Sequence, residues 1–195
     1  MEKIIYPFFA LLLLLSPFAT ANQGYKYSPP GCDFEATFPG EPGLIKRCPS
    51  DATLPCYEVA QYTERAEEGQ TINVEMTCTI INSEIYESYN QYTMEQIIYN
   101  MVQDANLPEA PPVRYQEDEG GLKIVGTSGL KTTGFATKIF VSQAWLKPNS
   151  LMTVEAEMSL ESDEDGDKKF ADILRSIMPI EQPQSAPEAQ EPEAE

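Results

Sequence analysis

A run of acidic residues near the C-terminus has the spacing of a calcium-binding loop. Its carboxylates and one glycine fall at loop positions 1, 3, 5, 6, 7 and 12, which are Glu161, Asp163, Asp165, Gly166, Asp167 and Asp172. Position 1 is Glu rather than Asp, and the Asp at position 12 is too short for the usual bidentate contact. The alternative, which we favour, is an acidic turn that caps the following helix, with Asp165 or Asp167 as the N-cap.

Two short motifs resemble parts of serine enzymes. Ser128 to Lys131 reads S-x-x-K, and Lys131 to Gly134 resembles a K-T-G box, but in penicillin-binding enzymes these motifs lie far apart. The chain contains no His, so the usual base of a catalytic triad is missing. Paired carboxylates could still act as acid and base. We therefore expect a protein that is not an enzyme, with no catalytic or cofactor-binding residue to nominate. A carboxylate-based hydrolase is the third hypothesis for the function, after the two binding functions described at the end of this section.

Four cysteines, Cys32, Cys48, Cys56 and Cys78, have the even count that is typical of disulfides in an exported chain. A zinc site is disfavoured because the chain has no C-x-x-C and no His. A hairpin around the turn-forming segment 49–55 would place Cys48 opposite Cys56, which favours the pairs Cys48–Cys56 and Cys32–Cys78. The alternative pairs, Cys32–Cys48 and Cys56–Cys78, also fit adjacent antiparallel strands.

The N-terminus has the pattern of a cleaved signal peptide. Lys3 precedes an apolar run from Ile4 to Phe18, and Ala19-Thr20-Ala21 supplies small residues for cleavage. The run is shorter than the roughly 20 residues of a membrane-spanning helix. We predict that residues 1–21 are removed, that the mature protein is periplasmic or secreted, and that nothing inserts in a membrane after cleavage.

The mature chain is predicted to contain one folded domain between two irregular ends. Residues 22–31 are expected to be a linker, residues 32–178 a single α+β domain, and residues 179–195 a disordered acidic, Pro-rich tail. The net charge is −18. A surface this negative repels nucleic acids and anionic lipids, so we exclude a nucleic-acid partner.

Hydrophobic periodicity predicts the elements that must position these residues. Segment 151–160 alternates apolar and polar side chains, as in a strand with one buried face. The next segment changes to helical spacing at Phe170, Ile173, Leu174 and Ile177. A second helix is predicted to begin at a capping box of Thr93 and Gln96. Alternation predicts further strands at 32–38, 57–63, 72–80, 113–116, 122–126 and 135–145, with a hairpin arm before Cys48. The fold class is therefore α+β, with a mostly antiparallel sheet covered by helices.

Two segments resemble the PsbP-like family of small exported proteins. They are Phe38-Pro39-Gly40-Glu41-Pro42, after the first strand, and the closing helix from Phe170 to Ile177. The resemblance implies an α/β/α sandwich that serves as a binding or assembly module, although members of the family differ in their partners.

The favoured function is therefore a non-enzymatic exported binding or assembly module with a protein partner. Its expected contact surface is an exposed aromatic patch, with Tyr86, Tyr89, Tyr92 and Trp145 as candidates. The alternative is a calcium- or small-ligand-binding envelope protein that uses the acidic turn from Glu161 to Asp172.

Overall fold

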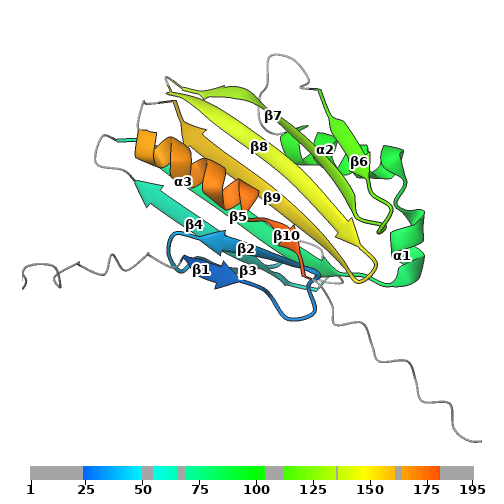
Figure 1. Ribbon diagram of the computed structural model, residues 1–195. Coiled ribbons are helices and arrows are strands. Elements are labelled where there is room, and N and C mark those ends of the chain that lie inside the picture. Colours follow the sequence, from blue (N-terminus) through cyan, green and yellow to red (C-terminus); the bar gives the residue numbers. More distant parts are fainter. Residues whose placement is uncertain are drawn as a thin grey trace, which may run out of the picture.

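A seven-stranded antiparallel sheet dominates the computed structural model, which describes residues 24–49, 55–65, 69–103, 112–134, 136–160 and 164–180 (Figure 1). The strand order is β3-β4-β5-β9-β8-β7-β6. The strands are β3 (Gly43–Arg47), β4 (Tyr57–Arg65), β5 (Thr71–Ile80), β6 (Arg114–Glu117), β7 (Lys123–Thr133), β8 (Ala136–Lys147) and β9 (Ser150–Ser159). All of its strand pairs are antiparallel, which confirms the predicted α+β class and sheet type.

One face of this sheet is covered by α3 (Glu164–Arg175) and a small second sheet (Figure 1). The small sheet has the order β1-β2-β10, with β1 (Tyr25–Tyr27), β2 (Phe34–Phe38) and β10 (Met178–Pro179). Alternate residues of β9, such as Val154, pack here with Phe34 of β2 and Ile173 of α3, all fully buried or nearly so. The predicted alternation of β9 thus becomes the main core of the protein.

The other face is covered by α2 (Gln91–Val102), which follows the short helix α1 (Ser83–Ser88). Met94, Ile98 and Val102 lie at intervals of four on α2 and are buried against β7 and β8. Their partners include Phe140 and Ala144, which alternate with the β8 residues of the first face. Helices α2 and α3 therefore lie on opposite faces of one sheet.

Two disulfides fix the end of the sheet where β3, β4 and β5 meet. The bond Cys32–Cys78 joins the segment just before β2 to β5. The bond Cys48–Cys56 closes the β3–β4 hairpin. They are the pairs that we favoured over Cys32–Cys48 with Cys56–Cys78. Among the described residues, no helix has the length and apolar character needed to cross a membrane.

Several predicted boundaries differ from the observed ones. Helix α2 begins two residues before Thr93, because the side chain of Asn90 accepts the Thr93 N–H at 3.0 Å and acts as the N-cap. Strand β7 does not stop at Gly126 but continues to Thr133. Strand β1 forms within the expected linker, and Pro179, which we placed in the tail, belongs to β10.

Candidate functional site

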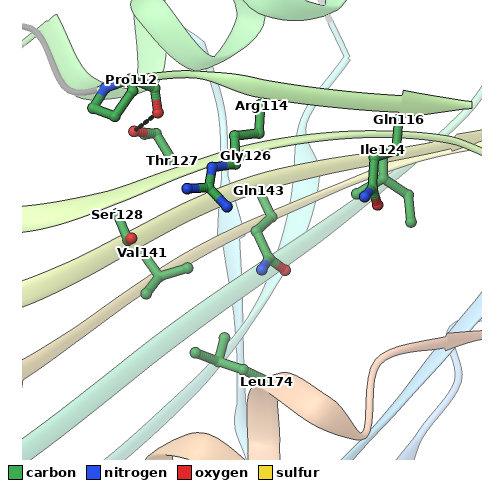
Figure 2. A pocket seen from close by; sticks show the side chains of 10 residues that line it. All are labelled: Pro112, Arg114, Gln116, Ile124, Gly126, Thr127, Ser128, Val141, Gln143 and Leu174. Atoms are coloured by element: carbon green, nitrogen blue, oxygen red, sulfur yellow. Dashed lines mark hydrogen bonds between the residues drawn. The ribbon is translucent and has the colours of Figure 1, made fainter.

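A groove of about 520 Å³ lies beside α3, on the part of the sheet that neither α3 nor β2 covers (Figure 2). Its floor is formed by β6, β7 and β8, and Leu174 of α3 forms the opposite wall. Side chains that reach it include Arg114, Gln116, Ile124, Ser128 and Gln143. The groove exists because α2 protects β6–β8 only on the other face, while α3 lies over β2 and β5.

Strand register places a glycine between two polar residues in the groove floor. Arg114 of β6 pairs with Gly126 of β7, and Gly126 pairs with Gln143 of β8. A Cβ atom at Gly126 would lie 3.2 Å from Gln143 Cγ and 3.2 Å from the Ser142 carbonyl oxygen. Glycine therefore lets the Gln143 side chain and the Ser142 carbonyl oxygen pack closely against β7 in this row, with Arg114 on one neighbouring strand and Gln143 on the other (Figure 2).

Hydrogen bonds hold the strands around the groove. Tyr86 donates from its hydroxyl to the carbonyl oxygen of Gly121 at 2.7 Å, and Gly121 has the left-handed φ of 74° that the β6–β7 turn requires. Thr127 donates from its hydroxyl to the Pro112 carbonyl oxygen at 3.1 Å, which holds the segment before β6 (Figure 2). Trp145 Nε1 donates to Gln143 Oε1 at 3.1 Å and so orients the Gln143 amide.

The described residues that line the groove include one charged residue, Arg114, and no carboxylate. Two other hollows in the described part of the structure also contain one basic residue each, Arg47 and Lys131. Both of those are paired: Arg47 Nη2 lies 2.8 Å from Glu75, and Lys131 contacts Glu157. Among the residues that the structure describes, Arg114 has no such partner. The groove is therefore a local positive site on a chain of net charge −18.

The residues of the S-x-x-K motif do not come together. Ser128 and Lys131 are three residues apart on β7, so their side chains leave opposite faces of the sheet. Ser128 faces the groove, whereas Lys131 pairs with Glu157 on the other face. This arrangement gives the serine hydroxyl no adjacent base from that motif.

The acidic turn is mostly helix where the structure describes it. Helix α3 begins at Glu164, so Asp165 and Asp167 lie in its first turn, and the prediction that one of them is the N-cap is wrong. Asp165 and Asp172 are separated by roughly 10 Å along the helix axis. Asp165 pairs with Lys169 at 2.9 Å, and Asp167 accepts a hydrogen bond from Gln70 at 3.0 Å. Glu161 and Asp163 lie outside the described residues, within which no three acidic side chains are placed to share an ion.

The predicted aromatic patch is divided between the two faces. Tyr86 and Tyr89 pack against the α2 core, whereas Trp145 lies on the α3 side, with its ring 6.2 Å from that of Phe34. Tyr92 is 69% exposed. These four residues therefore do not form one contact surface.

A polar network lies on the α2 face of the sheet, on β3, β4, β5 and β9. Gln61 Nε2 donates to Glu75 at 2.9 Å, and Glu75 also pairs with Arg47. Glu155 is the cross-strand neighbour of Glu75. Loss of hydration raises the pKa of Glu155, and the charge of Glu75 raises it further, against the opposing effect of Arg47. The network has two carboxylates and one guanidinium, which leaves Glu155 in an unfavourable position for its negative charge.

We expect Glu155→Gln to raise the melting temperature at pH 7. A carboxyl whose pKa is raised on folding stabilises the folded state only while it is protonated, and this contribution is lost as the pH rises through that pKa. The gain should therefore disappear below the pKa of an unfolded glutamate, about 4.3. Thermal melts of both proteins from pH 3 to pH 8 measure it. An equal difference at all pH values would contradict the electrostatic cause.

The groove residues were not identified from sequence. Arg114, Gly126 and Gln143 come from three strands, and only the register across those strands brings them into one row. The available signal was weak: Arg114 and Gln116 alternate with Val113 and Tyr115, which assigns them to one face of a short strand.

Comparison with protein-family models finds no match to this chain, and comparison with curated proteins finds no significant match.

Proposed function

We propose that the protein is an exported, non-enzymatic binding module whose groove between α3 and β6–β8 receives a segment of a protein partner. The observation that supports this most is the combination of a hollow of about 520 Å³ with Arg114 in its lining, a residue that has no ion-pair partner within the described part of the chain. This volume lies within the usual range of ligand pockets, roughly 300–1,000 Å³. A cation without a carboxylate neighbour keeps its capacity to bind an external anion.

Other features support export and a binding role. Two disulfides are compatible with an oxidising compartment outside the cytoplasm, in agreement with the signal peptide proposed at residues 1–21. Helices on both faces of an antiparallel sheet are compatible with the α/β/α sandwich that the PsbP-like resemblance implies. We therefore retain membership of this family, and a periplasmic or secreted location, as parts of the proposal.

Filling the groove should abolish binding of the partner. We expect Ser128→Tyr to place a ring over the groove floor and to reduce recovery of a crosslinked partner about tenfold, by analogy with the loss of a central interface contact. The measurement is crosslinking of the tagged full-length chain in intact cells, followed by mass spectrometry. Ser128 is exposed on a strand, where tyrosine is well accepted, so the variant should fold.

The matched control is Thr132→Tyr, which adds the same ring four residues further along the same face of β7, outside the groove lining. Its partner recovery should equal that of the unmodified chain. Removal of residues 181–195 should also leave recovery unchanged, and the truncation begins there because the Ile180 N–H still donates to the Asp33 carbonyl oxygen. Equal partner recovery from Ser128→Tyr and Thr132→Tyr would contradict the proposal, as would loss of the partner with the truncation.

A further inference from the structure

We propose that the groove recognises a carboxylate that is flanked by an aliphatic side chain, carried by a peptide segment of the partner; this inference rests on the proposed function. Arg114 and Gln143 would bind the carboxylate near Gly126, and the aliphatic side chain would pack against Val141 and Leu174. The proposal specifies the chemistry of the partner, which the groove volume alone does not.

Two hydrogen-bond donors lie on the strands on either side of Gly126 in the groove floor. Gln143 Oε1 accepts from Trp145 Nε1, so the Gln143 Nε2 amino group is left to donate. Arg114 donates through its guanidinium from the strand on the other side of Gly126. Strand spacing of about 4.8 Å places the backbones of Arg114 and Gln143 roughly 10 Å apart, with the missing side chain of Gly126 between them. The two donors therefore line the same groove and can both be offered to one acceptor group that enters it.

The charge of the site favours a singly charged acceptor. The described lining of the groove offers one formal positive charge, while the whole chain carries −18. Repulsion from the surrounding protein grows with the charge of the ligand, so a monoanion is favoured over a dianionic phosphate. A guanidinium and a carboxylate also match as a planar, bidentate pair.

The other lining residues indicate what accompanies the carboxylate. Ile124 and Val141 flank the Arg114–Gly126–Gln143 row on neighbouring positions of β7 and β8, and Leu174 faces them from α3 (Figure 2). Val141 and Leu174 thus provide an apolar surface on one side of the polar centre, and Ile124 lies on its other side. An aliphatic residue beside the acidic one would bury apolar area there without leaving a polar group unpaired.

The test uses a heptapeptide library displayed on phage, selected against the folded chain. We expect the enriched peptides to share an Asp or Glu next to Leu, Ile or Val. For the tightest peptide, Arg114→Gln in the protein and Glu→Gln (or Asp→Asn) in the peptide should each weaken binding roughly 10- to 100-fold. The two changes together should be little worse than either alone, because both remove the same contact.

Arg65→Gln is the control for the change in net charge, because Arg65 is also exposed and without an ion pair in the described residues but lies at the end of β4, away from the groove. It should leave affinity within about twofold of that of the unmodified chain, as expected for a surface charge. Inorganic phosphate should compete with the peptide no better than acetate. Enrichment of no peptide, enriched peptides without an acidic residue, additive effects of the two changes, or stronger competition by phosphate would each overturn the carboxylate assignment.

The two proposals fail in different ways. If Ser128→Tyr removes the cellular partner while Arg114→Gln leaves it in place, the groove is the binding site but the carboxylate assignment is wrong. If neither change affects recovery of the partner, both proposals are wrong.

Discussion

Replacing Cys32 and Cys78 together with alanine should lower the free energy of unfolding by roughly 4 kcal/mol. The two residues are 46 apart, so their bond restricts a long loop of the unfolded chain. The bond also joins the start of the Phe34–Phe38 strand to β5, and thus the small sheet to the large one. Denaturant unfolding followed by far-UV circular dichroism measures the change.

The second disulfide supplies a matched comparison. Cys48 and Cys56 are only 8 residues apart, and the same loop-entropy relation predicts a loss of roughly 2.5 kcal/mol when both are replaced with alanine. The cost should therefore be larger for Cys32–Cys78 by between 1 and 2 kcal/mol, by about the same relation. A larger loss from the Cys48–Cys56 pair would contradict the chain-entropy explanation.

Replacing Phe34 with alanine should cost about 3–5 kcal/mol, the usual range for a buried aromatic residue. Phe34 is 0% exposed, and its ring makes an edge contact with Trp145 at a centroid distance of 6.2 Å. The substitution leaves a cavity between the small sheet and the large one. Because Trp145 is the only tryptophan of the chain, a shift of its fluorescence would report the altered contact directly.

Leu44→Ala is the control for Phe34→Ala, since Leu44 is 57% exposed on the edge strand β3. It should change stability by less than about 0.5 kcal/mol and leave the Trp145 fluorescence unchanged. A loss below about 1 kcal/mol in Phe34→Ala would mean that β2 is not part of the main core.

The sequence predicted the parts of the fold that carry regular hydrophobic patterns. Met152, Val154, Ala156 and Met158 alternate on β9 and are all buried, and Phe170 with Ile173 marks the buried side of α3. These patterns are local, so a short window contains all of the information. The disulfide pair Cys48–Cys56 followed from a single hairpin, whose register places Arg47 opposite Tyr57 and the cysteines next to them.

Features that depend on contacts between distant segments were missed. Strand β1 is only Tyr25–Tyr27, and it forms because β2 offers a pairing edge and Tyr27 can pack on Phe38. Asn90 rather than Thr93 caps α2, although both have suitable side chains, because the chain already turns at the end of α1. Local propensity could not distinguish these cases.

The candidate site depends still more on tertiary structure. Arg114 and Gln143 are 29 positions apart by their numbers, and each is an ordinary polar residue in a strand pattern. Their placement on either side of Gly126 follows from the register of two strand pairs, and the groove follows from where α3 ends. Neither property can be read from composition or periodicity.

The central claim is that a partner occupies the groove, and a photo-crosslinking residue at position 128 tests it most directly. Incorporated in place of Ser128 in the full-length chain, it should form a covalent product with one dominant envelope protein on irradiation of intact cells. The same residue in place of Thr79, exposed on the opposite face of the sheet, should not form that product. An equal yield of the same product from both positions, or a product from position 79 alone, would contradict the claim.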